Sequence, residues 1–130
     1  MISKYLTDIN IKEENIPWFW NPNDSRQEQW KEQRKKYGFD ERDTWSLSYT
    51  LILLIYPRLK MYDEINIVDT SFHKIKHKDK EYTCQECIDR VLKGMEIYLS
   101  KDELDLKDEE IKELGECMII LGKIWWLLWW

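Results

Sequence analysis

The sequence predicts a mainly α protein, with about four helices packed as a compact orthogonal bundle over residues 23–130 and an extended aromatic N-terminal arm over residues 1–22. Three observations predict this fold. The chain has eight tryptophans but only four glycines and three prolines, which indicates a helix-rich chain. Residues 51–55 are apolar on every side of a helix, and apolar residues recur at helical spacing over 84–99. Because the chain has 130 residues, we expect one domain with one core.

The arm is predicted from two prolines that flank aromatic residues in the run Pro17-Trp18-Phe19-Trp20-Asn21-Pro22. A proline disfavours helical backbone in the residue before it, so we expect the arm to be extended. Three adjacent aromatic side chains are costly to leave in water. They are expected either to cover the helical body or another subunit, or to form a surface on which a ligand stacks.

A basic surface helix is predicted from Ser25 to Tyr37. Ser25 followed by Glu28 is a capping-box pattern, and Gly38 is suited to end the helix in the left-handed conformation. Trp30 is the only large apolar residue inside it, and lysines and arginines surround that residue. Acidic residues are interleaved, which favours a solvated face over a nucleic-acid surface.

A central helix is predicted to begin near Trp45, with Asp43 or Thr44 as its cap. Because residues 51–55 have no polar face, we expect this helix to be buried on every side. Pro57 removes one backbone donor and crowds the preceding turn. It therefore predicts either a kink or a new helix that carries Pro57 in its first turn.

The next stretch is less regular. Residues 61–67 either finish a helix or, at 65–67, begin a short strand, and residues 69–81 are expected to form a polar excursion. Thr83 with Glu86 is a second capping-box pattern, and it opens the amphipathic helix over residues 84–99.

The last helix is predicted to start at Asp105 or Asp108, where acidic residues suit the positive end of the helix dipole. It carries two neighbouring apolar seams. The first seam is Ile111, Gly115, Met118, Gly122, Trp125 and Trp129; the second is Leu114, Cys117, Leu121, Ile124 and Leu128. The two glycines of the first seam remove side chains where a neighbouring backbone or a flat aromatic ring comes close.

The run Gly38-Phe39-Asp40-Glu41-Arg42-Asp43-Thr44-Trp45-Ser46-Leu47, followed by Pro57-Arg58-Leu59-Lys60, resembles a signature of small uncharacterised proteins encoded by tailed bacteriophages and prophages. The signature spans about a fifth of the chain, and a looser likeness extends over residues 84–99 and the tryptophan-rich C-terminal helix. Where the signature has an acidic residue after the leucine, this chain has Ser48. The resemblance implies a viral accessory protein and supplies no established chemistry.

The most site-like residues lie in the same stretch. Arg42, Asp43 and Trp45 bring a planar cation, an acceptor and an indole together at a helix start, and Arg58 and Lys60 follow the central helix. These five residues are the predicted ligand-binding site: purine rings would stack on tryptophan, and phosphates would meet the basic groups. The structural alternative is that Asp43 caps the helix, Arg42 pairs with a neighbouring acid and Trp45 fills the core.

A metal site and a redox site are weaker alternatives. His73, His77, Cys84 and Cys87 are zinc-ligand types at close spacing, but the order of the pairs is reversed and both cysteines fit a buried helix stripe. A Cys-x2-Cys pair at a helix start can also be redox-active, although no thioredoxin-like strand pattern surrounds it. We expect neither a bound metal nor a cofactor.

Other function classes are excluded by composition and by missing motifs. The formal charge of −5 disfavours duplex nucleic acid. The C-terminal apolar run over residues 118–130 is too short to span a bilayer. Three cysteines and no signal-peptide pattern indicate the cytoplasm, here that of a host bacterium. No phosphate loop, nucleophile elbow or His-Glu-x2-His motif is present, so we expect no enzymatic activity.

Two functions remain. The first is a phage anti-defence protein that acts as an oligomeric trap and sequesters a small anionic nucleotide signal. The alternative is a direct protein-binding inhibitor of a host defence factor, anchored by exposed aromatic residues. Both include a homo-oligomer, because the C-terminal tryptophans cover too many helical directions for one small core.

Overall fold

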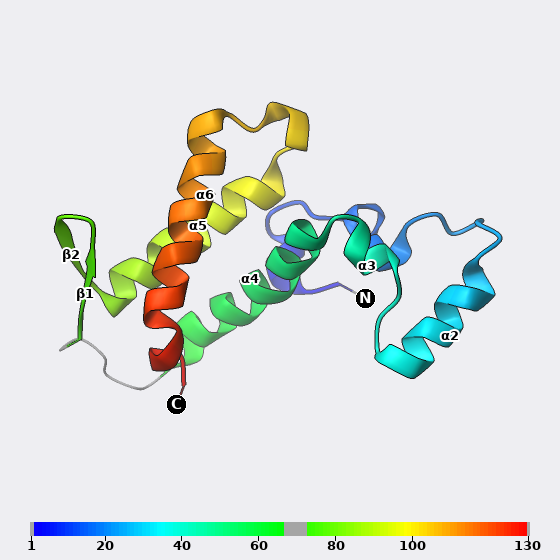
Figure 1. The fold of residues 1–130 in the computed structure, drawn as a ribbon, viewed down its shortest axis with the longest axis horizontal. Helices are drawn as coiled ribbons and strands as arrows, with labels where there is room; N and C mark the ends of the chain where they lie inside the picture. The colour runs from blue at the N-terminus through cyan, green and yellow to red at the C-terminus, as the bar shows by residue number, and fades with distance from the viewer. Residues whose placement is uncertain (1, 67–72, 130) are drawn as a thin grey trace. The chain divides into compact units, whose positions relative to one another are not determined.

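The computed structural model describes residues 2–66 and 73–129 (Figure 1). Over these residues the chain is mainly helical, as predicted, with six α-helices, four 3-10 turns and a two-stranded sheet. Two of the six helices are single turns that the sequence pattern does not reveal. The chain divides into two compact units, Met1–Ile55 and Tyr56–Trp130, and each is described by itself. A single domain and orthogonal packing of the helices remain predictions.

The first unit begins with short helical turns instead of the predicted extended arm. They are α1 (Lys4–Thr7), η1 (Glu13–Asn15) and η2 (Pro17–Phe19). Pro17 takes the first position of η2, where its fixed φ suits the turn and its missing N–H costs little. The prediction was wrong because a proline restricts the residue before it but is compatible with a helical turn after it. Extended backbone returns at Trp20.

Helix α2 (Gln27–Tyr37) is the predicted basic surface helix. Gly38 ends it with a φ of 86°, in the left-handed region as predicted. Its start differs from the prediction, because Arg26 is the N-cap residue and no side chain caps the helix. The Asp24 carboxylate instead accepts a hydrogen bond from the Arg26 N–H at 2.9 Å. The expected capping box at Ser25 is therefore absent.

A one-turn helix, α3 (Arg42–Trp45), precedes the long helix α4 (Leu47–Ile65), and Ser46 breaks the chain between them. Neither Asp43 nor Thr44 caps this region with its side chain. Glu41 is the N-cap residue of α3 and forms no side-chain cap, and Asp40 before it accepts a hydrogen bond from the Arg42 N–H through Oδ1 at 3.0 Å. The predicted helix start near Trp45 was right to within two residues, whereas the predicted cap was wrong.

Helix α4 runs through Pro57 as one helix, so the new helix that was one of the two expectations does not form. The prediction of burial on every side was also wrong. Ile52 and Leu53 are buried, but Leu51 and Leu54 are 47% and 40% exposed. Scattered exposed apolar side chains are common in folded proteins, and an apolar stretch therefore does not by itself guarantee that other elements cover it.

The second unit contains a hairpin that the sequence did not predict. Strands β1 (Lys74–His77) and β2 (Lys80–Thr83) pair antiparallel within the stretch expected to be a polar excursion. Lys78 takes a positive φ of 55° in the turn. Hairpin turns usually place glycine or asparagine at such a position, so a lysine gives no recognisable signal. The alternative strand at residues 65–67 ends outside the described residues, and Ile65 belongs to α4.

Helices α5 (Cys84–Ser100) and α6 (Asp108–Ile124) lie side by side and form the core of the second unit (Figure 1). The turns η3 (Glu103–Asp105) and η4 (Trp125–Leu127) precede and follow α6. The capping box of Thr83 and Glu86 is confirmed by reciprocal bonds of 3.1 Å. The amphipathic face of α5 is also confirmed. Its buried residues include Cys87, Ile88, Val91, Leu92 and Met95, and they face the α6 residues Cys117, Ile120, Leu121 and Ile124.

Gly94 of α5 is the glycine with the closest neighbour, and that neighbour belongs to α6. A Cβ atom added to Gly94 would lie 2.5 Å from the Cys117 Sγ, whereas one added to Gly115 or Gly122 would meet no described residue within 4 Å. A side chain at Gly94 therefore requires Cys117 to shift, whereas at the two glycines of α6 the described part of the chain leaves space for one. Along the described part of the chain, every helix falls short of the length and apolarity needed to cross a bilayer.

Candidate ligand-binding site

A buried carboxylate, Asp40, organises the first unit. It follows Gly38 in the turn between α2 and α3, and its side chain has no exposed surface. Asp40 Oδ1 accepts from Arg42 Nε at 2.9 Å and Asp40 Oδ2 accepts from Arg42 Nη2 at 2.8 Å, which is a bidentate ion pair. Arg34 of α2 donates to the same Oδ2. One carboxylate thus ties α2 to α3 through two arginines.

Arg42 also reaches the N-terminal turns. Its Nη1 donates to the Trp20 carbonyl oxygen at 2.7 Å, so three of its five N–H groups are used by Asp40 and Trp20. Only 3% of the residue is exposed. Its guanidinium lies 4.3 Å from the centre of the Trp30 ring, within cation–π range. The pairing of Arg42 with a neighbouring acid, the structural alternative for this residue, is present.

Trp30 is the fully buried centre of the same cluster. Its Nε1–H donates to Glu41 Oε1 at 2.8 Å, and the Trp45 ring packs against it edge-on at 5.8 Å. The Arg26 guanidinium lies 5.0 Å from the Trp30 ring and 5.3 Å from the Trp45 ring. Trp45 remains 43% exposed, so it does not fill the core as the structural alternative supposed.

The pKa values of Asp40 and Asp43 are shifted in opposite directions. Burial alone would raise the pKa of Asp40, but hydrogen bonds from Arg42 and Arg34 outweigh that effect and lower it. Burial, followed by the charge of Asp40, raises the pKa of Asp43. The Asp43 Oδ1 atom is buried and, within residues 2–66 and 73–129, has no hydrogen-bond partner. Such an atom is costly unless something donates to it.

A pocket of about 620 Å³ opens beside this pair of carboxylates. This volume lies in the range typical of sites for small molecules. Aromatic rings and a few charged groups form its wall, which is the usual composition of such sites. Its lining residues are Trp18, Phe19, Pro22, Gln27, Arg34, Gly38, Phe39, Asp40, Arg42, Asp43 and Leu54, all of them in the first unit.

The structure brings two of the five predicted site residues, Arg42 and Asp43, to this pocket. Trp45 lies beside Trp30 and does not line it. Arg58 and Lys60 belong to the part of α4 in the second unit, where Arg58 is exposed and Lys60 half-buried. The role of these five residues in ligand binding remains a prediction.

Sequence reasoning missed Asp40 and Arg34, which hold the pocket wall together, and it assigned Phe39 no role. Asp40 carried a usable signal, because an aspartate in the short turn after a helix-ending glycine commonly accepts a hydrogen bond from the backbone N–H two residues further on. The pairing of Arg34 with Asp40 carried none. It depends on how the turn at Gly38 folds back toward α2.

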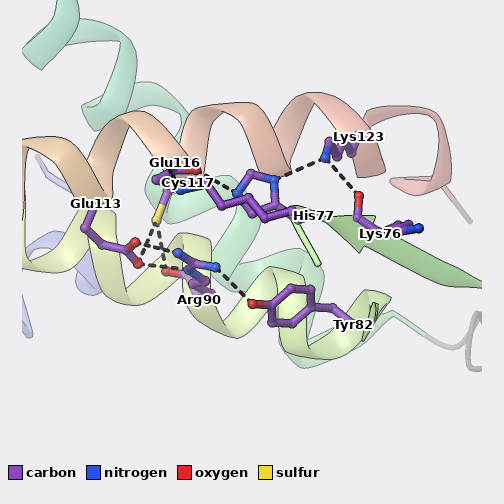
Figure 2. Close-up of polar contacts among 9 residues, drawn as sticks. Lys76, His77, Tyr82, Arg90, Glu113, Glu116, Cys117 and Lys123 are labelled. Carbon is purple, nitrogen blue, oxygen red and sulfur yellow. Dashed lines mark hydrogen bonds and ion pairs between the residues drawn. The ribbon is translucent and has the colours of Figure 1, made fainter. Parts of the chain in front are cut away.

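The candidate zinc ligands are not gathered. His77 Nε2 lies 2.6 Å from Glu116 Oε2, and its Nδ1 lies 3.1 Å from the Lys123 Nζ, so both ring nitrogens have protein partners (Figure 2). His73 packs edge-on against Trp126 at 5.2 Å. Among the described residues, no three histidine, cysteine or acidic side chains are grouped as a metal site requires.

The cysteines at the start of α5 are buried, which opposes the redox alternative. Burial raises the pKa of Cys87 to about 11 and that of Cys117 to about 11, so at neutral pH both remain thiols. Cys117 donates to the Arg90 carbonyl oxygen at 3.4 Å, and the Arg90 side chain pairs in bidentate fashion with Glu113 (Figure 2). These contacts join α5 to α6 and serve the fold.

Fold and site together define a small, mainly helical protein with an aromatic, charged pocket in its first unit. The chain matches no protein-family model, and no curated protein or solved structure is significantly similar to it.

Proposed function

We propose that this chain is a bacteriophage accessory protein that binds a small purine-type nucleotide signal without turnover and thereby blunts a defence response in the cytoplasm of the host bacterium. Its working form in this proposal is a homo-oligomer. The resemblance of residues 38–60 to phage proteins supports the setting. The pocket of the first unit carries the binding part of the proposal.

The observation that carries it is that Asp43 lines an aromatic pocket and that its buried Oδ1 atom has no hydrogen-bond partner among the residues that the structure describes. A purine base offers a flat ring and N–H donors. Stacking on an aromatic side chain contributes about 1–3 kcal/mol per base, and Trp18, Phe19 and Phe39 supply such rings. An N–H of the base would donate to the Asp43 carboxylate, and a rotation of this side chain would bring the buried Oδ1 atom to that donor and remove the cost of leaving it without a partner.

The charges of the pocket suit a ligand with few phosphates. The lining holds two arginines, Arg34 and Arg42, and two carboxylates, those of Asp40 and Asp43, so the pocket has no excess positive charge with which to bind several phosphates. The Arg34 side chain is 40% exposed, whereas that of Arg42 is 3% exposed. We therefore assign contact with the phosphate to Arg34, and the support of the pocket wall to Arg42.

Calorimetric titration with a panel of cyclic and linear nucleotides tests the proposal, followed by heat denaturation to show that the bound nucleotide is released intact. Phe39→Ala removes a lining ring that is already 50% exposed, so it should leave the fold intact and weaken binding by roughly 5- to 150-fold. Leu47→Ala is the control, because Leu47 is 53% exposed and does not line the pocket. Tyr37 would not serve, since the centre of its ring lies 6.4 Å from that of Phe39.

Asp43→Asn separates the roles further. An amide of the same shape keeps the packing but replaces one of the two acceptor oxygens by a donor. Binding should weaken while thermal stability is retained or increases. Wild-type affinity in both Phe39→Ala and Asp43→Asn would remove this pocket from the site, and a chemically altered nucleotide after release would show turnover instead of capture.

A direct protein-binding inhibitor is the second candidate, favoured by the exposed indoles of Trp125, Trp126 and Trp129. Exposed tryptophans are common anchors of protein interfaces. The two candidates differ in a simple assay. A trap removes its nucleotide from solution in the absence of any other protein, whereas an inhibitor of this kind leaves the nucleotide free and blocks the host factor at a fixed ratio of chains.

A further inference from the structure

The outward face of α6 carries an exposed apolar stripe, and the ring of His73 packs edge-on against Trp126 at its C-terminal end. Ile111, Ile119 and Trp126 are 53%, 53% and 62% exposed, and Gly115 and Gly122 are exposed between them. The five residues recur every three or four positions, so they follow one line along the helix and into η4. We refer to these five residues as the α6 stripe. Its sequence of sizes is large, small, large, small, large.

The fold of the second unit does not explain the two glycines of the stripe. The opposite face of α6 packs on α5 through Cys117, Ile120 and Ile124, all fully buried. Close approach there is achieved by Gly94 of α5. Among residues 2–66 and 73–129, nothing lies within 4 Å of a Cβ added to Gly115 or Gly122, yet glycine weakens a helix relative to alanine. A close neighbour that is not part of this unit would account for them.

Four of the five stripe residues form two pairs that are symmetric about the point between Met118 and Ile119, and Ile119 lies next to that point. Gly115 and Gly122 are equally distant from that point along the helix, and so are Ile111 and Trp126. A two-fold axis through it therefore places Gly115 opposite Gly122 of the second copy, and Ile111 opposite Trp126 of the second copy. This is the self-complementarity that a symmetric dimer interface requires.

We propose that α6 pairs with α6 of a second copy of this chain, antiparallel, about a two-fold axis between Met118 and Ile119. The glycines let the two helix backbones approach, and each large side chain lies against the partner helix. The same axis sets Lys112 opposite Trp125 of the second copy, and both are exposed, which provides a cation–π contact. The inference rests on the homo-oligomer of the proposed function and not on nucleotide capture.

The large side chains along the stripe provide a modest area for a dimer. Trp125 and Trp126 are 61% and 62% exposed, and Ile111 and Ile119 are each 53% exposed. With ~250 Å² for a whole indole side chain, these four side chains offer roughly 500 Å² per chain. Two copies together reach about 1,000 Å², the area that a biological interface is expected to bury.

The first test adds large side chains at the two glycines, where the paired helices would approach each other. Gly115→Leu with Gly122→Leu should raise the dimer dissociation constant at least 100-fold in sedimentation velocity, without lowering the thermal midpoint of the monomer, because the added side chains meet open space within one chain. Lys93→Leu, which adds the same side chain at an exposed position of α5, is the control and should leave the dimer intact. A double-leucine variant that dimerises normally, or a wild-type chain that is monomeric at 100 µM, overturns the proposal. The second case would mean that another part of the chain or a host protein covers the stripe.

The second test reads the orientation of the helices by thiol crosslinking. Ile119→Cys lies next to the axis, so it should crosslink to its own copy with a short bis-maleimide in the full-length chain. Lys112→Cys should not, because the two copies of residue 112 would lie roughly 20 Å apart in an antiparallel pair. Crosslinking at residue 112, which a parallel pair would give, or its absence at 119 overturns the proposal. Nucleotide titration of the double-leucine variant reports separately on the pocket, so the failure of one proposal is distinguishable from the failure of the other.

Discussion

Asp40→Asn should unfold the first unit more readily than any exposed substitution in it, because it removes the counter-charge of a buried arginine. The asparagine keeps the shape of the side chain and can still accept from the Arg42 N–H. It leaves the Arg42 guanidinium, 3% exposed, without its bidentate partner. Breaking a buried ion pair from one side typically costs about 3–5 kcal/mol. That is a large part of the roughly 5–15 kcal/mol that stabilises a whole domain.

Hydrogen exchange measured by mass spectrometry is the appropriate assay, because it reports on the two units separately. Peptides from α2 and α3 should lose protection in Asp40→Asn, and peptides from α5 and α6 should keep it. Asp8→Asn is the control: the Lys4–Asp8 pair is exposed, so its loss should cost less than about 0.5 kcal/mol.

A second variant shows whether charge is the cause. Adding Arg42→Met to Asp40→Asn removes the unpaired buried charge, so the double variant should be more stable than Asp40→Asn alone. If Asp40→Asn changes the free energy of unfolding by less than about 1 kcal/mol, or if the double variant is the less stable of the two, the role assigned to Asp40 is wrong.

Three further predictions concern packing, acid and thiols. Gly94→Ala should lower stability by about 1–2 kcal/mol in urea unfolding, because overpacking against Cys117 exceeds the gain of about 1 kcal/mol in helix propensity; an unchanged or raised midpoint would contradict it. The pKa values of Asp40 and Glu113 are lowered in the folded state, that of Glu113 mainly by the hydrogen bond from Arg90. The stability that these two carboxylates contribute should therefore be complete above the pKa of an unfolded carboxyl group. It should decline below about pH 4 when unfolding is measured in an acid titration. The thiols of Cys87 and Cys117, whose pKa values are raised to about 11 by burial, should react with an aromatic disulfide at neutral pH only after denaturation; rapid reaction of the native chain would refute their assignment as core residues.

Local rules in the sequence were enough to determine several elements of this protein. The left-handed end of α2 at Gly38 and the capping box that opens α5 each depend on residues a few positions apart, and the start of α6 at Asp108 is one of the two positions that the sequence offered. The buried face of α5 follows from the period of a single helix. Short-range chemistry decides such features whatever surrounds them, which is why they were predictable.

Tertiary structure decided the rest. Nothing near Arg34 in the sequence shows that it shares Asp40 with Arg42, and the pocket beside Asp43 exists only because the turns before α2 and the turn after it meet. The two apolar seams of α6 looked equivalent in the sequence. The structure buries one on α5 and leaves the other exposed, because a helix can turn only one of its faces toward a given neighbour. Local patterns specify what each segment prefers, whereas the choice among partners depends on contacts between residues that are distant along the chain.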